Sequence, residues 1–473
     1  MEKNFYITTT APYVNAEPHI GFAFEIVTAD VIARYHHLLG KKVGFNTGTD
    51  EHGLKIYQEA LAKNVEPQVY VDTNAKKFKD LIPLLNLSVT HFNRTTNPHH
   101  IEAAQAFWLR CDKNGDIYKK NYKTKYCVGC ELEKTDSDLV NNRCPLHPNR
   151  QLEMYEEENY FFRFSRYQKK LLKLYEDNPR YVLPESKYKE IISFVSRGIN
   201  DFSISRLKSK LPWGVEVPGD NSQVMYVWFD ALIYYISSLG WPKDTKQFKA
   251  YWPGMQIAGK DNLRQQSAMW QAMLMSAGLP NSTQILINGF ISVNGQKMSK
   301  SLGNVISPQE MVDRFGVDGT RYLLVNLGPV HEDIDISWDK LVVRYNNGLA
   351  NGLGNTVARI AKLCQQSGFD FPPDTPPGFR SQVKNHLDDF RFDRALEVIW
   401  QTLKDIDQKI EGTKPWQLKG QALKIKLTAW VAHLRQVGYE LQPFLPATAQ
   451  KIIHQFIGPK IESKASLFPR LNP

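Results

Sequence analysis

The chain has 473 residues, of which 42% are hydrophobic and 23% are charged. This length and composition predict about three domains and exclude global disorder, and the absence of any apolar run of about 18 residues predicts no membrane span. The net charge is +10, from 59 Lys and Arg against 49 Asp and Glu, which suits either a polyanionic partner such as nucleic acid or a merely basic surface.

The first 53 residues predict a parallel α/β start. Residues 4–10 are β-branched and aromatic and predict a strand. Apolar residues recur at three- and four-residue spacing over 19–39, which predicts an amphipathic helix ended by Gly40. Residues 42–45 predict a short strand that leads into a polar turn at 48–53. The order strand, helix, strand is typical of a parallel sheet.

The rest of the chain changes character twice. Residues 118–149 are polar, short-turned and cysteine-containing, and beyond residue 345 the periodicity is mostly helical. Between and after these points we expect a return strand at 156–162, a helix at 165–177, an apolar aromatic segment at 223–235, one buried strand at 284–293, and helices at 382–410 and 420–441. The layout is an α/β core, interrupted by an insertion and followed by a helical domain.

Five cysteines indicate a metal site and a reducing compartment. Cys127 and Cys130 form a CxxC pair, and after thirteen intervening residues Cys144 and His147 form a CxxH pair. Four such ligands suit tetrahedral Zn²⁺ and leave no open position, so the role is structural. The alternative is four unrelated buried residues. The odd number of cysteines argues against a disulfide framework, and Cys111 and Cys364 are expected in the core.

Two further segments are suited to binding phosphate. Residues 18–21, Pro-His-Ile-Gly, stand where the first strand turns into the first helix, and a helix N-terminus offers free N–H groups to an anion. Residues 297–301, Lys-Met-Ser-Lys-Ser, follow a predicted strand and a turn, and their donors can close over a triphosphate. The alternatives are a local histidine cap and a solvated loop.

With these segments in order, the chain resembles the class I aminoacyl-tRNA synthetases and, within them, the methionyl-tRNA synthetases, from Asn4 to at least Trp416. The matching segments are residues 13–21, 48–53, the cysteine knuckle, 226–231 and 297–301. The resemblance implies a Rossmann-type nucleotide-binding core with a zinc-bearing insertion and a C-terminal α-helical bundle. The implied divisions are 1–115 and 223–290 for the two core halves, 116–222 for the insertion with its knuckle at 127–147, 291–344 for the lysine loop and stem-contact region, and 345–473 for the anticodon-binding domain.

The resemblance also assigns roles to single residues. His19, Lys297 and Lys300 match catalytic positions, and ATP is expected to contact His19, Gly21, Gly259, Asp261, Ile291, Lys297, Ser299 and Lys300. The positions that match an amino-acid pocket are Tyr13, Asp50, Trp228, Ala231, Tyr235, Asn262 and Gln266. Asn355, Arg359 and Trp416 match anticodon-reading positions. The alternative for Asp50 is that it holds its turn, a role that can coexist with binding a substrate ammonium. The alternative for Trp228 and Tyr235 is a place in the core, and the last three could serve solvation or packing.

The sequence departs from the family pattern at three positions. The phosphate segment ends in Phe22 where the family has a histidine, and loss of one transition-state donor costs roughly two to three orders of magnitude in rate. Asn262 replaces an apolar residue and Gln266 replaces a histidine. We expect Asn262 to make the pocket more polar, since a buried unpaired amide costs about 1–3 kcal/mol.

The resemblance implies a methionine–tRNA ligase that uses ATP, Mg²⁺ and one structural Zn²⁺. Its partners are L-methionine and tRNA(Met). Two alternatives remain open, a paralogue that activates another amino acid without tRNA and a non-catalytic tRNA-binding protein. The N-terminus lacks the apolar segment of a signal peptide, so a cytoplasmic protein without a membrane partner is expected. A monomer is expected because no additional C-terminal dimerising domain follows the bundle.

Overall fold

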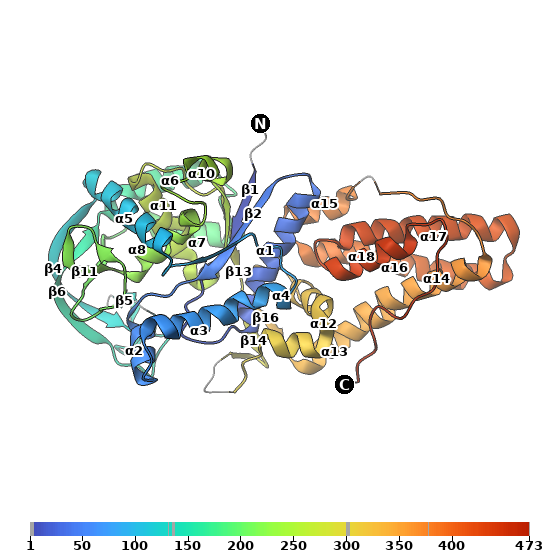
Figure 1. The fold of residues 1–473 in the computed structure, drawn as a ribbon, viewed down its shortest axis with the longest axis horizontal. Coiled ribbons are helices and arrows are strands. Elements are labelled where there is room, and N and C mark those ends of the chain that lie inside the picture. The colour runs from blue at the N-terminus through green and yellow to red at the C-terminus, as the bar shows by residue number, and fades with distance from the viewer. Residues whose placement is uncertain (1–3, 131, 135–137, 299–302, 377, 473) are drawn as a thin grey trace. The chain divides into compact units, whose positions relative to one another are not determined.

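The computed structural model describes residues 4–130, 132–134, 138–298, 303–376 and 378–472 (Figure 1). The chain divides into two compact units. The first unit comprises Met1–Pro18, Lys42–Asp80 and Val89–Asn288, and the second comprises His19–Lys41, Leu81–Ser88 and Gly289–Pro473. Each unit is therefore assembled from segments that are far apart in the sequence.

A six-stranded sheet forms the centre of the first unit, and its paired strands all run parallel. The strand order is β3 (His91–Arg94), β2 (Val43–Thr49), β1 (Phe5–Thr8), β12 (Met255–Gly259), β13 (Gln284–Asn288) and β7 (Val182–Leu183). The connections from β1 lead to β2 on one side, while β12 and β13 lie on its other side. Ligands of such sheets bind beyond the carboxyl ends of the strands at the point where the order reverses. The predicted parallel α/β core is confirmed.

Short helices surround this sheet and carry its aromatic core. Phe107 stacks on Trp270 with ring centroids 5.6 Å apart, and Trp241 meets Phe107 edge-on at 5.8 Å. Among its described residues, the unit contains the helices α2 (Leu54–Ala62), α3 (Pro67–Lys79), α5 (Pro98–Lys113), η2 (Phe164–Tyr167), α6 (Gln168–Asp177), α7 (Glu185–Ser196), α8 (Val227–Ala231), α9 (Tyr234–Ser237), α10 (Thr245–Tyr251), η3 (Lys260–Asn262), η4 (Gln265–Met269) and α11 (Trp270–Ser276).

Two smaller antiparallel sheets belong to the predicted insertion. The larger has the order β5 (Leu132–Lys134), β4 (Ile117–Cys127), β6 (Glu153–Phe162) and β8 (Phe202–Ser203). Its central pair runs in unbroken register from Ile117 opposite Phe162 to Tyr126 opposite Glu153. The smaller has the order β10 (Glu216–Val217), β11 (Asp220–Met225) and β9 (Ser205–Leu207). The predicted return strand is confirmed, and it pairs with a long strand that ends at the first knuckle cysteine.

The first helix, α1 (Ile20–Leu38), belongs to the second unit. The prediction that this helix is amphipathic is wrong. Its polar residues Glu25, Thr28 and Asp30 are buried along with its apolar ones. Asp30 is tolerated because it forms ion pairs with Arg34 and Arg321, both at 2.7 Å. The predicted bounds of α1 agree with the structure, but most of its residues on every side are buried and the expected solvent-exposed face is missing.

The predicted single strand at 284–293 is wrong. The chain forms β13 up to Asn288 and a separate strand, β14 (Ile291–Val293), which pairs with β15 (Gln296–Lys297) and β16 (Ile334–Ile336) in another sheet. The break falls at Gly289, whose N–H donates to the Val330 carbonyl at 3.0 Å. A Cβ at this position would lie 2.0 Å from the Glu332 carbonyl oxygen, so the close backbone approach requires glycine.

Helices make up the remainder of the second unit (Figure 1). The predicted helix at 382–410 is wrong in its continuity, because the chain breaks between α15 (Ser381–Asp388) and α16 (Phe392–Thr413). Phe390 lies at φ 56° there and buries its ring, so tertiary packing stops the helix. The predicted helix at 420–441 is confirmed as α17 (Gly420–Leu441). The other helices in the part of this unit that the structure describes are α4 (Leu81–Leu84), α12 (Pro308–Val325), α13 (Trp338–Tyr345), η6 (Asn346–Gly354), α14 (Asn355–Ser367), η7 (Pro415–Gln417) and α18 (Pro446–Phe456).

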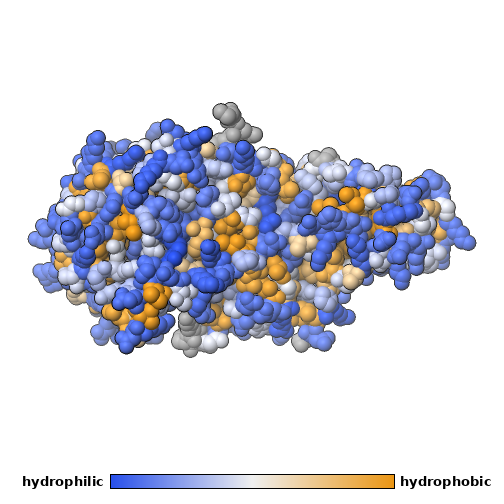
Figure 2. All heavy atoms as spheres, viewed as in Figure 1, coloured by the Kyte–Doolittle hydropathy of each residue, from blue (hydrophilic) through white to orange (hydrophobic). Residues whose placement is uncertain are grey.

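The surface is mixed in character. On the face drawn in Figure 2, hydrophilic residues separate the exposed hydrophobic atoms into patches. Within the described residues, every helix is either too short or too polar to cross a membrane.

Candidate active site and metal centre

A cavity of about 330 Å³ lies in the first unit. Its walls come from the loops that follow β1 and β2, from α8 and α9, and from the η3–η4 segment that follows β12. It is thus built where the sheet topology predicts a ligand site. All of the residues predicted to form an amino-acid pocket line it, namely Tyr13, Asp50, Trp228, Ala231, Tyr235, Asn262 and Gln266.

Asp50 is fixed through its backbone to the loop that carries Tyr13. The Asp50 N–H donates to the Pro12 carbonyl at 3.0 Å, and the Val14 N–H donates to the Asp50 carbonyl at 3.2 Å. These two bonds flank a parallel bridge between Tyr13 and Asp50. Asp50 is 7% exposed and borders the cavity, so a structural place in the turn and a place in the cavity wall coexist.

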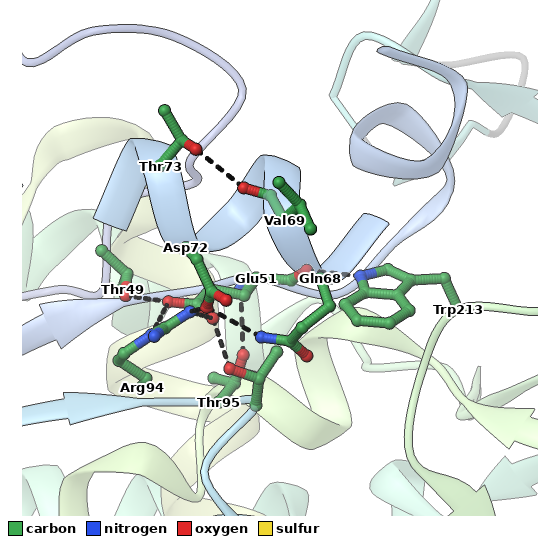
Figure 3. Close-up of polar contacts among 10 residues, drawn as sticks. Thr49, Glu51, Gln68, Val69, Asp72, Thr73, Arg94, Thr95 and Trp213 are labelled. Carbon is green, nitrogen blue, oxygen red and sulfur yellow. Dashed lines mark hydrogen bonds and ion pairs between the residues drawn. The ribbon is translucent and has the colours of Figure 1, made fainter. Parts of the chain in front are cut away.

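Glu51, the next residue, holds this loop in place through its hydrogen bonds to neighbouring side chains (Figure 3). Its buried carboxylate accepts two hydrogen bonds from Arg94, from Nε at 2.6 Å and from Nη2 at 2.8 Å, and two more from the Thr49 and Thr96 hydroxyls at 2.5 Å. Its carbonyl accepts the Trp213 indole N–H at 2.7 Å. No role for Glu51 was predicted from the sequence, although its place between Asp50 and His52 was the available signal.

His52 joins the same loop to the wall formed by α8. His52 Nδ1 lies 2.6 Å from Asp230 Oδ2, and His100 Nε2 lies 2.9 Å from Asp230 Oδ1. Burial acts to raise the pKa of Asp230, but His52 and His100 outweigh it and hold that pKa far below its usual range. Asp230 stands between Phe229 and the cavity residue Ala231, so the buried cluster fixes two walls against each other.

Gln266 is fully engaged inside the protein. Its Nε2 donates to the Tyr235 hydroxyl at 2.5 Å, and its Oε1 accepts from Gln256 Nε2 at 3.1 Å. Asn262 differs from expectation, since it is partly exposed and its Nδ2 lies 3.4 Å from Asp261 Oδ1. The penalty expected for a buried unpaired amide therefore does not apply to Asn262.

The predicted ATP residues fall in both units. Gly259 ends β12 and exposed Asp261 borders the cavity in the first unit, whereas His19, Gly21, Ile291 and Lys297 belong to the second. Ser299 and Lys300 lie outside the described residues.

His19 is the N-cap of α1, as expected under the alternative that this histidine caps the helix locally. Its Nδ1 accepts the Gly21 N–H at 3.0 Å. A Cβ on Gly21 would lie 2.8 Å from His19 Cε1, so glycine permits this cap. The pKa of His19 is lowered, first because surrounding protein removes water from the ring and then because Lys297 is positively charged.

The three predicted anticodon residues lie on the helices of the second unit. Asn355 is exposed at the start of α14, and Arg359 stands one turn later, where Nη1 contacts Asp407 Oδ1 at 3.2 Å. Trp416 is 61% exposed in η7. A tryptophan this exposed offers a face on which a base can stack, and the roles of all three residues stay predictions.

The four predicted metal ligands form one cluster. One ligand atom from each of Cys127, Cys130, Cys144 and His147 lies within 4.8 Å of all the others. His147 Nδ1 lies 3.2 Å from Cys130 Sγ, 3.8 Å from Cys127 Sγ and 4.0 Å from Cys144 Sγ. Tetrahedral zinc with bonds of about 2.0–2.3 Å holds its ligand atoms about 3.5–3.8 Å apart, so the cluster fits this ion.

Comparisons with known proteins agree over nearly the whole chain. The family profile described as "tRNA synthetases class I (M)" matches residues 5–151 and 133–361. A methionine–tRNA ligase of Brucella suis is 40% identical over 95% of this chain and 91% of its own length. A methionine–tRNA ligase of Caldanaerobacter subterraneus is 39% identical over 96% of this chain and 74% of its own length.

The chain belongs to the methionine–tRNA ligase family. The methionyl-tRNA synthetase of Mycobacterium tuberculosis, solved in complex with methionyl-adenylate, superposes with a TM-score of 0.91 at 35% identity, covering 99% of this chain and 100% of that one. Its free form gives a TM-score of 0.83 at 32% identity, covering 100% of this chain and 99% of that one. These relatives favour a methionine–tRNA ligase over the two alternatives.

Proposed function

We propose that the chain joins L-methionine to the 3′ end of tRNA(Met) by way of methionyl-adenylate, at the cost of ATP. The observation that carries this proposal is that every residue predicted for amino-acid binding lines the same cavity. Asp50 supplies the negative charge that a substrate ammonium requires, and the aromatic rings of Tyr13, Trp228 and Tyr235 suit a polarizable thioether.

In the first step, a carboxylate oxygen of methionine attacks the α-phosphorus of ATP, and the bond to pyrophosphate breaks. The attacked phosphorus and the leaving pyrophosphate gain negative charge, which His19 and Lys297 stabilise together with Lys300. Mg²⁺ bound to ATP supplies additional neutralising charge. In the second step, a ribose hydroxyl at the 3′ end of tRNA takes the methionyl group and AMP leaves. Positioning and charge stabilisation account for both steps, and no covalent enzyme intermediate is required.

The Cys127–His147 knuckle would hold one structural Zn²⁺ through three sulfurs and His147 Nδ1. Gly129 supports this role, because a Cβ there would lie 2.5 Å from the His147 ring and push it out of the cluster. Gly129 and Cys130 also border the cavity, so the ion would stabilise one of its walls.

The helical part of the second unit is proposed to bind the anticodon through Asn355, Arg359 and Trp416. This assigns residues 345–473 to tRNA recognition, residues 291–344 to the lysine loop and stem contact, and 1–115, 116–222 and 223–290 to the split core and its insertion. The structure describes all five cysteines and none of them forms a disulfide, which supports action in the reducing cytoplasm. Action as a monomer stays a prediction.

The test is amino-acid-dependent ATP–pyrophosphate exchange with zinc-loaded protein across all twenty amino acids. Exchange with methionine alone, followed by methionylation of tRNA(Met), is the expected result. Exchange with a different amino acid would establish the paralogue instead. If folded protein exchanges with none of them but binds tRNA, the non-catalytic alternative holds.

A further inference from the structure

The cavity contains one positive charge to which no role has been assigned. A free amino acid is a zwitterion, and the residues discussed so far account for its ammonium and its side chain but not for its carboxylate. Among the described residues that line the cavity, Lys55 alone is cationic. It lies in the first turn of α2, the helix that follows the Asp50 loop, and is half-buried.

Lys55 is held in the same bonded network as Asp50. With the Asn15 amide oriented to suit its neighbours, Lys55 Nζ donates to the Asn15 oxygen at 2.8 Å, and the Asn15 nitrogen donates to the Tyr13 carbonyl at 3.0 Å. Tyr13 in turn pairs with Asp50 through the parallel bridge. Asn15, Tyr13 and Asp50 all border the cavity, so the lysine is tied to the wall that carries the carboxylate.

Another residue that lines the cavity, Trp228, has a donor that lacks an acceptor. The indole Nε1 of Trp228 is buried and has no hydrogen-bond acceptor among the residues that the structure describes. Buried N–H groups without a partner are rare, and each one calls for an explanation. An acceptor atom on a bound ligand would satisfy this one, and it would meet the charge of Lys55 in the same space.

We propose that Lys55, together with the Trp228 N–H, binds the α-carboxylate of the substrate amino acid. This inference rests on the proposed function and deepens it. Asp50 and Lys55 then hold the two charged ends of the zwitterion, which sets the direction of the amino acid in the cavity. A carboxylate has two oxygens, so one can accept from Lys55 and Trp228 while the other attacks the α-phosphorus.

The test compares L-methionine with methioninol, which lacks the carboxylate, in calorimetric titrations of zinc-loaded full-length protein without ATP. Lys55→Met is expected to weaken methionine binding about 10- to 100-fold, because a charge-assisted hydrogen bond is lost, and to change methioninol binding less than twofold. Lys55→Arg keeps the charge and retains part of the affinity. Asp50→Asn weakens both ligands, since both carry the ammonium.

Lys79→Met is the matched control, because Lys79 is an exposed lysine on α3 that does not border the cavity, and it should bind both ligands as the wild type does. Equal weakening of methionine and methioninol by Lys55→Met would overturn the proposal and leave Lys55 a supporting residue of the wall. Unchanged methionine binding with a raised KM for ATP would overturn it in favour of phosphate binding.

Thermal unfolding confirms that each variant is folded, and Lys55→Gln takes the place of Lys55→Met if the latter is not. Failure of the proposed function has a different outcome, because the wild-type protein would give no methionine-dependent ATP–pyrophosphate exchange at all. Methionine-dependent exchange by the wild type with equal methionine affinity in the wild type and Lys55→Met would reject only the role of Lys55.

Discussion

Glu51 and Arg94 form a two-point ion pair whose carboxylate is completely buried, immediately beside Asp50 in the chain. A planar guanidinium bound through two nitrogens fixes direction as well as distance. The pair therefore holds the backbone that presents Asp50 to the cavity. Glu51 acts on the ligand through its neighbour and is a positioning residue.

Glu51→Gln is expected to destabilise the protein by about 3–5 kcal/mol, because it leaves the partly buried Arg94 without its main countercharge. It should also raise the KM for methionine several-fold and leave the KM for ATP little changed. Urea unfolding measures the loss of stability, and the kinetics of ATP–pyrophosphate exchange measure the two KM values. Asp72→Asn is the matched control, since Asp72 contacts the same arginine but is half-exposed, and its loss should cost below about 1 kcal/mol. An unchanged methionine KM in Glu51→Gln would show that Asp50 does not depend on this pair.

Asp230 is expected to position the opposite wall. Asp230→Asn keeps the shape but replaces one acceptor oxygen by a donor, so one of His52 and His100 loses its partner. We expect methionine affinity to fall about tenfold, corresponding to about 1.4 kcal/mol. Ser237→Ala removes the contact to His100 Nδ1 and the hydrogen bond from Asn93 Nδ2 but leaves both contacts to Asp230, so it should have a smaller effect. Equal effects of the two substitutions on methionine binding would contradict a positioning role for Asp230.

The pH dependence of this cluster follows from the lowered pKa of Asp230. A carboxyl group whose pKa is depressed by folding stabilises the native state at neutral pH and loses that contribution only as the pH falls through the native value. Asp230 should therefore remain ionised throughout the range from about pH 5 to 8, in which stability is usually measured. Unfolding experiments with the wild type and Asp230→Asn should give a difference in free energy that does not decrease as the pH falls from 8 to 5. A difference that shrinks between pH 8 and 5 would contradict the lowered pKa.

Short-range patterns in the sequence predicted their structures well. The spacing of the knuckle cysteines and His147, the bounds of α1 and α17, and the parallel start of the sheet all depend on residues that are near each other in the chain. The aromatic and polar residues of the cavity were placed by resemblance, and the structure gathers them into one site.

Contacts between distant residues were not predictable in this way. No pattern in the sequence marks Arg94 as the partner of Glu51, or His100 as a partner of Asp230. The break at Gly289 depends on the backbone of Glu332, and the break at Phe390 depends on where its ring is buried. Such features follow from tertiary packing, which local propensity and periodicity do not contain.

Zinc content is expected to depend on a glycine as well as on the four ligands. Gly129→Ala places a methyl group against the His147 ring and should lower the bound zinc per chain, and Cys144→Ser should lower it further. Metal analysis by mass spectrometry gives the content. Gly412→Ala is the matched control, because a Cβ at that position in α16 meets no atom within 4 Å. Full zinc content in Gly129→Ala would show that His147 is not the fourth ligand.

Removal of the metal by a chelator should also weaken methionine binding, since Gly129 and Cys130 border the cavity. Titration of the same sample before and after chelation, and again after zinc is restored, separates this effect from irreversible damage. Identical methionine affinity in the zinc-free protein would mean that the knuckle wall keeps its shape without the ion.

The second unit contains a buried ion pair that ties its first helix to its last ones. Arg321 and Asp30 are both inaccessible to solvent and lie 2.7 Å apart. The same guanidinium donates to the carbonyls of Leu85, Pro443 and Phe444 at 2.9–3.1 Å. One side chain therefore joins α1 and α12 to the segment between α17 and α18.

Asp30→Asn should destabilise the protein by about 3–5 kcal/mol, because Arg321 then remains buried without its ion-pair partner. Burial opposes ionisation of Asp30, but Arg321 and Arg34 outweigh it and lower its pKa, so the contribution is complete at neutral pH and is lost only on strong acidification. Asp80→Asn, which removes an exposed pair with Lys76, should cost below about 1 kcal/mol. Urea unfolding at pH 7 checks both values. Similar small losses in the two variants would mean that the backbone carbonyls alone hold Arg321 in place.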